Sequence, residues 1–145
     1  MDCKLNLGCG DKKLEGFDNL DLPWRYETGL RYKDDSVDAI TISHSLMYVR
    51  LSDYPYVFSE FYRVLKPEGV IRITEDDTMN ERSERVGGYP GANSLTYPEM
   101  MLDLLEHAGF KAFGCLPTWS SYKDDSLMQN FHGTPPKVFF VEGIK

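Results

Sequence analysis

The chain has 145 residues, of which 41% are hydrophobic and 13% aromatic, and its formal net charge is −7 at pH 7. This length is typical of one compact domain, and the hydrophobic content is too high for an intrinsically disordered chain. An acidic surface repels a nucleic-acid backbone, and the strongest basic cluster, Lys12 with Lys13, is too small to offset that repulsion. We therefore expect a single domain over residues 1–145 that binds no nucleic acid.

Membrane and metal-binding classes are also disfavoured. No apolar run approaches the roughly 18 residues of a membrane-spanning helix, and the N-terminal residues lack the pattern of a secretory leader. Cys3, Cys9 and Cys115 form no CxxC pair, and three cysteines suit reduced thiols in a cytoplasmic protein. The three histidines are scattered without the spacing of zinc ligands. We expect a cytoplasmic protein that has no membrane contact and no structural metal.

The first third of the chain contains short strands around two glycines. Residues 4–7 alternate in hydrophobicity, residues 8–16 predict a loop or a stunted helix, and residues 19–22 predict a second strand. Residues 23–35 have no regular pattern. The stretch SVDAITIS at 36–43 alternates and is rich in β-branched side chains, which predicts a buried, central strand.

A helix is predicted next, with Ser52 as its N-cap and Pro55 in its first turn. Its apolar stripe, at helical spacing, consists of Val57, Phe61, Val64 and Leu65. Residues 66–69, KPEG, end this helix, and residues 70–74, VIRIT, predict the following strand.

A second helix follows residues 96–99, TYPE, which have the pattern of a capping box, and Gly109 is its expected C′ residue. Its apolar face consists of Met101, Leu104, Leu105 and Ala108. Residues 110–116 and 137–144 predict two strands that form an antiparallel pair. Because strands alternate with helices, we expect an α/β fold with a mostly parallel sheet and an antiparallel C-terminal strand.

Polar residues and glycines cluster where the predicted strands end. In an open α/β sheet, ligands bind beyond the carboxyl ends of the strands. The candidate site residues at these ends are Gly8, Cys9, Gly10, Asp21, Ser43, His44, Asp76 and Asp77. The long connections at 75–95 and 117–136 are expected to leave the same edge, and loops of this length in a small domain are often functional.

The glycine loop and the acid after it suit an adenosine ligand, because a carboxylate at the next strand end can accept the ribose hydroxyls. Asp21 follows Gly10 by eleven positions, and Lys13 stands where a dinucleotide-binding loop would have its third glycine. Such loops place their acidic residue about 20 residues on, so a nicotinamide cofactor is disfavoured. The competing interpretation is a plain tight turn with Asp21 as a turn residue.

His44, Asp76 and Asp77 are the candidate catalytic residues, since each could take a proton from a bound acceptor. The alternatives are that His44 only bonds backbone groups and that the two aspartates are solvated turn residues.

Five segments, in order along nearly the whole chain, resemble a compact class I S-adenosylmethionine-dependent methyltransferase. They are LNLGCG, NLDL, DDSVDAITISHSL, EFYRVLKPEGVIRIT and FFVEGIK. The RVLKPEG corner is similar to the RVLKPGG corner of that family, with Glu68 in place of a glycine.

The resemblance implies a Rossmann-like sheet, shortened relative to typical class I members. It also implies S-adenosylmethionine as the cofactor, with its methionine part at the loop 8–10, its ribose at Asp21, and the reacting methyl group near Ser43 and His44. The chain departs from the family at Lys12, which occupies the third glycine position of GxGxG. Residues 23–35 are too short for a full third strand–helix unit, so the acid that often recognises adenine has no counterpart.

We therefore expect a methyltransferase that acts on an oxygen or nitrogen of a small-molecule acceptor, chosen by residues in the two long connections. The alternative is a non-catalytic S-adenosylmethionine-binding protein that serves as a sensor or partner subunit. A DNA methyltransferase is disfavoured by the acidic charge and by the missing Pro-Pro-aromatic motif after the fourth strand. Monomer and homodimer are both compatible with the sequence.

Overall fold

The computed structural model describes residues 1–21, 29–80, 93–129 and 137–145. In these residues one six-stranded sheet has the order β2-β1-β3-β4-β6-β5. The strands are β1 (Lys4–Leu7), β2 (Asp18–Leu20), β3 (Val37–Ser43), β4 (Leu65–Asp76), β5 (Lys111–Gly114) and β6 (Val138–Ile144). The helices are α1 (Tyr54–Val64) and α2 (Pro98–Ala108), with short 3-10 helices η2 (Leu46–Tyr48), η3 (Leu51–Asp53) and η4 (Asp125–Gln129).

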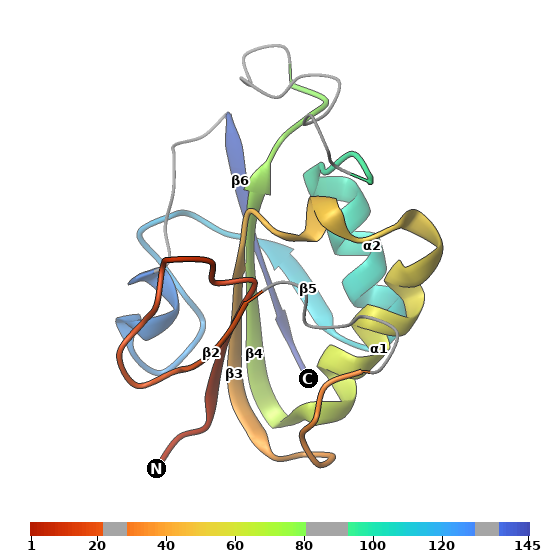
Figure 1. Cartoon of the computed structure of the whole chain (residues 1–145). Coiled ribbons are helices and arrows are strands. Elements are labelled where there is room, and N and C mark those ends of the chain that lie inside the picture. Colours follow the sequence, from red (N-terminus) through yellow and green to blue (C-terminus); the bar gives the residue numbers. More distant parts are fainter. Residues whose placement is uncertain (22–28, 81–92, 130–136) are drawn as a thin grey trace.

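The sheet is mostly parallel. Strands β2, β1, β3 and β4 pair in parallel, whereas β6 is antiparallel to both β4 and β5. The α/β fold and the antiparallel C-terminal pair predicted from the sequence are therefore confirmed. The carboxyl ends of the parallel strands lie together at one edge of the sheet, toward the top of Figure 1.

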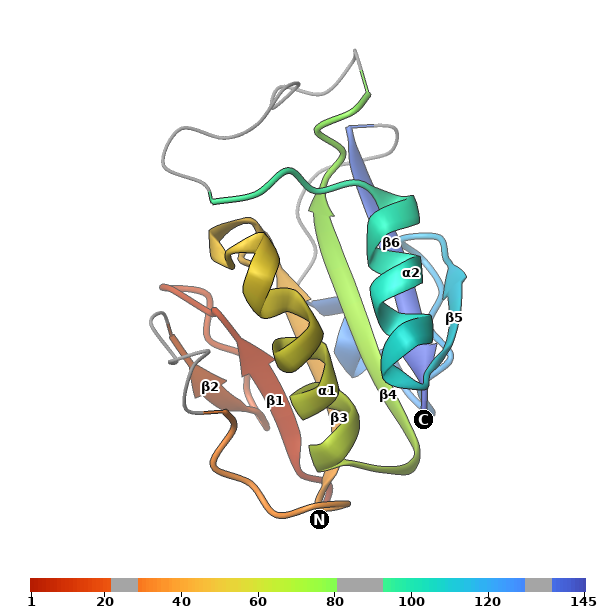
Figure 2. The same ribbon diagram turned by 90° about the vertical axis from the view of Figure 1, so that its right-hand side faces the viewer.

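Helices α1 and α2 cover one face of this sheet, where they lie side by side (Figures 1 and 2). Their amphipathic stripes bury Val57, Phe61 and Leu105 completely or almost completely against strand residues such as Ile40 and Ile73. This helical face holds the main hydrophobic core, because the apolar stripes of both helices meet the apolar side of β1, β3 and β4 there.

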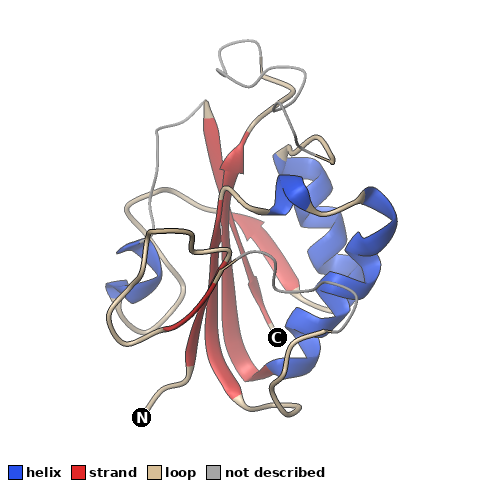
Figure 3. Ribbon diagram, in the orientation of Figure 1, coloured by secondary structure: helices blue, strands red, loops and turns tan. Residues whose placement is uncertain are grey.

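The other face is covered in a different way, by the β1–β2 loop and by the segment that contains η4 (Figure 3). Its apolar cluster is small and is built on Phe17, Ala39, Val70 and Leu127. The loop is held by the buried amide of Asn6, whose Nδ2 donates to Lys12 O and to Asn19 Oδ1, both at 2.8 Å. Hydrogen bonds from polar side chains thus help to hold the loop on this face, where a packed apolar α-helix is absent among the described residues.

A buried ion pair holds the second segment of this face. Arg72 on β4 and Glu142 on β6 are 2% and 0% exposed, and Arg72 Nη1 lies 2.8 Å from Glu142 Oε2. Arg72 also donates to the Trp119 carbonyl at 2.9 Å, and Glu142 accepts from the Ser121 amide at 2.7 Å. The pair therefore ties the chain after β5 to the centre of the sheet.

Both predicted helices exist, but their predicted N-caps are wrong. Ser52 lies within η3, and α1 begins at Tyr54 with Asp53 at the N-cap and Pro55 in the first turn. The residue at the N-cap of α2 is Tyr97, because the Thr96 hydroxyl instead donates to the Asp76 carbonyl at 2.7 Å. The Thr96 hydroxyl thus forms a long-range hydrogen bond with Asp76 and does not cap α2.

The C-terminal boundary of α2 is confirmed, since Gly109 has a left-handed φ of 115°. Strand β4 is longer than predicted, reaching from Leu65 to Asp76, and the corner before its central part places Glu68 at φ 68°. Strand β5 is shorter than predicted, since it ends at Gly114. Residue 22 of the predicted second strand, residues 23–28 of the irregular stretch, and residues 81–92 and 130–136 of the two long connections lie outside the described residues.

Within the described ranges, no helix combines the length and the hydropathy needed to cross a membrane. Cys3, Cys9 and Cys115 are free thiols.

Candidate active site

The strand registers bring the first group of candidate residues together at the carboxyl edge. Leu7 of β1 pairs with Leu20 of β2 and with Ile42 of β3. The next residue along each of these strands is a candidate, so Gly8, Asp21 and Ser43 follow in adjacent positions.

Residues at the end of β2 accept hydrogen bonds from the backbone amides of the glycine loop. The amides of Gly8 and Cys9 donate to the Leu20 carbonyl at 2.7 and 3.2 Å, and the Gly10 amide donates to Asp21 Oδ1 at 2.9 Å. Gly8 and Gly10 have φ values of 65° and 50°, in the left-handed region that glycine tolerates best. Asp21 therefore closes the loop at the point where β2 ends, with its carboxylate at the exposed surface.

Cys9 and Ser43 lie beneath this surface. The Cys9 side chain is 6% exposed, its Sγ is 3.4 Å from the Gly10 carbonyl, and burial raises the pKa of its thiol. Ser43 is buried, and its hydroxyl has no hydrogen-bond partner among the residues described. A ligand above the loop would thus meet the backbone of Cys9 rather than its thiol.

His44 and Asp76 form the second group. His44 follows β3 with φ 53°, and its amide donates to the Thr74 carbonyl at 2.8 Å. Its Nδ1 lies 3.5 Å from Asp76 Oδ2, and the two side chains are 24% and 17% exposed. This is a partly exposed histidine beside a carboxylate, an arrangement that suits proton transfer because the carboxylate orients the imidazole ring.

Asp77 takes no part in the His44–Asp76 contact. Its Oδ1 accepts from the Met79 amide at 3.1 Å, and burial raises the pKa of its carboxyl group. With Asn80 it lines a cavity of about 420 Å³ whose other walls come from the start of α2, the end of β5 and the first half of β6. The cavity's remaining lining residues are Pro98, Gly114, Cys115, Leu116, Val138, Phe139, Phe140 and Val141.

Sequence reasoning missed Glu75 and Ser45, which lie in the same region. Glu75 is fully buried, and its Oε1 accepts from the amides of Ser45 and Leu46 at 2.9 and 2.8 Å. Burial raises the pKa of Glu75 to about 8. A signal was present, because Glu75 continues the alternation of Ile71 and Ile73 and so lies on the side of β4 that faces the main hydrophobic core.

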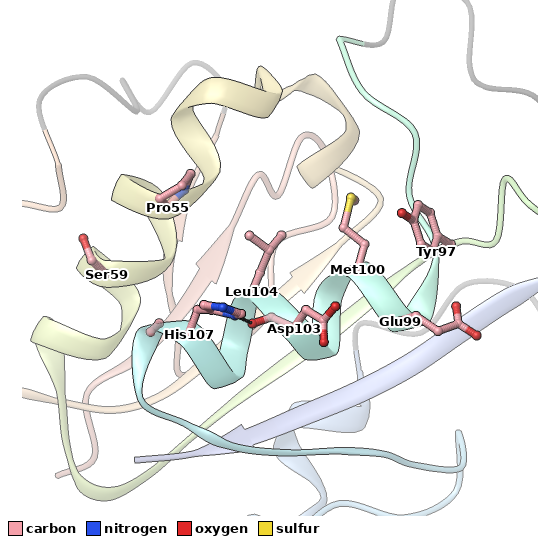
Figure 4. A pocket seen from close by; sticks show the side chains of 9 residues that line it. Pro55, Ser59, Tyr97, Glu99, Met100, Asp103, Leu104 and His107 are labelled. Atoms are coloured by element: carbon pink, nitrogen blue, oxygen red, sulfur yellow. Dashed lines mark hydrogen bonds between the residues drawn. The ribbon is translucent and has the colours of Figure 1, made fainter.

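A larger cavity, of about 670 Å³, lies between α1 and α2 (Figure 4). Met100 and Leu104 of α2 and Pro55 of α1 line it, with Asp103 and His107 among its polar residues. None of the candidate residues from the sequence lines this cavity.

Comparison with known proteins identifies the fold. A family model described as a methyltransferase domain matches residues 24–73, and no curated protein sequence matches the chain. A SAM-dependent methyltransferase from Archaeoglobus fulgidus superposes with a TM-score of 0.69 at 15% identity, covering 99% of this chain and 86% of that one. A Thermotoga maritima SAM-dependent methyltransferase, described as a possible histamine N-methyltransferase, gives 0.63 at 18% identity, covering 100% and 83%.

A third structure, an S-adenosylmethionine-dependent methyltransferase from Mesorhizobium loti, gives a TM-score of 0.63 at 14% identity, with 99% and 90% covered. At these identities the superpositions establish a shared fold, and the family model covers the segment from before β3 into β4. The family model matches about a third of the chain, so the comparisons show that the chain has the Rossmann-like fold of S-adenosylmethionine-dependent methyltransferases and that its residues 24–73 are similar to a methyltransferase domain.

Proposed function

We propose that this protein transfers the methyl group of S-adenosylmethionine to an oxygen or nitrogen of a small-molecule acceptor. The proposal assigns the cofactor to the β1–β2 side of the carboxyl edge and the acceptor to the side of β4 and β6. Its main support is that His44, beside Asp76, follows β3 between these two halves.

The residues on the cofactor side fit an adenosine. A Cβ atom added to Gly10 would meet no atom of the described residues within 4 Å, so these residues leave the space above the loop open, next to the exposed carboxylate of Asp21. A carboxylate has two oxygens that together accept about four hydrogen bonds, so the bond from the Gly10 amide is compatible with bonds from ribose hydroxyls. We infer that Asp21 holds the ribose and that the backbone of residues 8–10 lies along the cofactor.

On the acceptor side, the cavity of about 420 Å³ combines apolar walls with the polar side chains of Asp77 and Asn80. A pocket of this kind suits a small molecule with an apolar body and one or two polar groups. We infer that Asp77 and Asn80 orient the acceptor.

Methyl transfer depends mainly on aligning the nucleophile with the methyl group of the donor. S-adenosylmethionine supplies an activated methyl carbon, so holding the nucleophile close and in line provides much of the acceleration. If Asp76 accepts the Nδ1 proton of His44, Nε2 is the atom that takes a proton from the acceptor. His44 is then the general base, and Asp76 orients it.

Calorimetric titration with S-adenosylmethionine, S-adenosylhomocysteine and NAD tests the cofactor half of the proposal. We expect micromolar binding of the two sulfur nucleosides, no binding of NAD, and a loss of at least about tenfold in affinity for Asp21→Ala. Asp11→Ala is the matched control, because it removes an exposed carboxylate from the same loop. Equal affinity of both variants and the wild type would remove Asp21 from the site.

The acceptor half is tested by screening small amines, phenols and carboxylic acids for acceptor-dependent formation of S-adenosylhomocysteine. With any acceptor found, His44→Ala should lower turnover by about 10²- to 10⁴-fold and leave the affinity for S-adenosylhomocysteine unchanged. Cofactor binding without turnover on any acceptor would favour the alternative of a non-catalytic sensor or partner subunit. The three free thiols suit a reducing compartment, and we infer a cytoplasmic location from them.

A further inference from the structure

One buried carboxyl group accepts hydrogen bonds from the turn that follows β3. Glu75 is fully buried near the end of β4, and its Oε1 accepts from two successive amides, those of Ser45 and Leu46. These amides begin η2, for which Ser45 makes no side-chain cap. Amides at the start of a helix lack partners within the helix, so Glu75 provides from another strand the cap that the local sequence does not.

The same turn touches both halves of the proposed site. Its first residue, His44, has a left-handed φ of 53° and faces Asp76. Its second residue, Ser45, packs directly against the glycine loop, since a Cβ atom on Gly8 would clash with the Ser45 hydroxyl. A shift of this turn would therefore move the imidazole ring of His44 together with Ser45, which supports the glycine loop.

A left-handed histidine persists only where its surroundings hold it there. The amide of His44 bonds to Thr74 of β4, and the next two amides bond to Glu75 of the same strand. Three successive amides of the turn are thus fixed by neighbouring residues of β4, and Glu75 supplies two of the three bonds.

We propose that Glu75 is the positioning residue of the active site, whose carboxyl oxygen fixes residues 44–46 so that His44 faces Asp76 and Ser45 supports Gly8. Its importance for catalysis rests on the proposed function, whereas its control of the turn does not. Glu75 itself is fully buried, so the proposal gives it a positioning role without direct contact to cofactor or acceptor.

Two substitutions of Glu75 distinguish the effect of its acceptor oxygen from the effect of the rest of its side chain. Glu75→Gln keeps a carbonyl oxygen that can accept from both amides, while Glu75→Ala removes the acceptor. Glu142→Gln is the matched control, because Glu142 is equally buried in the same sheet but bonds to Arg72 and the chain after β5. The first measurement is the imidazole NMR signals of His44, with those of His107 on α2 as an internal reference. The second is calorimetric affinity for S-adenosylhomocysteine.

We expect Glu75→Ala to shift the His44 signals and to weaken S-adenosylhomocysteine binding at least about tenfold. Glu75→Gln should restore both to near wild-type values, and Glu142→Gln should leave both unchanged. A folded Glu75→Ala protein with wild-type His44 signals would overturn the proposal. So would a Gln variant that is as defective as the Ala variant.

If Glu75→Ala does not fold, Glu75→Asp replaces it, since the shorter side chain cannot reach both amides and should give the same shift in weaker form. Wild-type His44 signals in a folded Asp variant would equally contradict the proposal. The two measurements also separate this inference from the proposed function. If the wild-type protein binds no sulfur nucleoside, the proposed function fails, while the His44 signals still decide whether Glu75 controls the turn.

Discussion

Replacing Arg72 with Met should destabilise the protein by about 3–5 kcal/mol, because it breaks a buried ion pair by removing one partner. Met approximates the length of the arginine stem but supplies no donor. Glu142 would keep its bonds from Ser120 and Ser121 while losing its only cationic partner among the residues described, and it is completely buried. A typical domain is stable by about 5–15 kcal/mol, so this single change would remove a large part of the total.

The magnitude follows from what the guanidinium group bonds. Besides Glu142, it donates to the carbonyls of Trp119 and Leu116 at 2.9 and 3.1 Å. Each buried acceptor that is left without a donor costs about 1–3 kcal/mol, unless the segment moves and reaches water. Arg72→Met should therefore also loosen the chain around Trp119.

Urea unfolding followed by circular dichroism gives the free energies for Arg72→Met, for Glu142→Gln and for the double variant. The double variant should be more stable than the sum of the two single losses predicts, by at least about 1 kcal/mol, because neither charge is then left unpaired. Hydrogen exchange at residues 118–122 reports the local loosening. The reasoning would be refuted if Arg72→Met cost less than about 1 kcal/mol or if the two single effects added without coupling.

Three other outcomes follow from the structure. Burial raises the pKa of Glu75 from its ordinary 4.5 to about 8, so the stabilisation linked to its bound proton is complete below pH 4.5 and is lost as the pH rises through 8. Glu75→Gln should remove up to about 1.4 kcal/mol per pH unit from the slope of unfolding free energy in that window, and an unchanged slope would contradict this assignment. Glu68 has a left-handed φ of 68°, so Glu68→Gly should raise the unfolding free energy by about 0.5–1 kcal/mol in thermal denaturation, and a less stable variant would show that its side chain outweighs the strain. Gly8→Ala should cost about 2 kcal/mol or more, because its Cβ would clash with Ser45, whereas Gly10→Ala should cost about 1 kcal/mol and mainly lower S-adenosylhomocysteine affinity; equal stability losses would show that the loop adapts.

The periodic parts of the chain could be predicted from sequence because their side chains pack mainly against one apolar face. The alternation of residues 36–43 and the stripe of α1 are signals of this kind, and both elements exist close to their predicted positions. The meeting of Gly8, Asp21 and Ser43 could also be predicted, since parallel strands bring their carboxyl ends to one edge.

The failures concern bonds between residues distant in sequence. Thr96 has the local pattern of a cap, yet its hydroxyl bonds to Asp76, twenty residues earlier. Glu75 resembles part of a solvated acidic run with Asp76 and Asp77, although it is buried against a turn thirty residues before it. Local sequence shows which groups can form hydrogen bonds, but the fold decides which partner each group meets.

The unequal cover of the two sheet faces has a thermodynamic consequence. The helical face buries a large apolar cluster, whereas the opposite face has a small one and depends on buried amides, a guanidinium group and a carboxylate. Exposure of apolar surface raises the heat capacity of unfolding, and exposure of polar surface lowers it. We call α1 and α2 the helical layer, and the β1–β2 loop with the segment that contains η4 the loop layer. Release of the loop layer should therefore change the heat capacity little, whereas loss of the helical layer should account for most of the heat-capacity change of unfolding. Cooling would weaken the contacts of the helical layer first, so the loop layer should be the less temperature-sensitive half of the molecule.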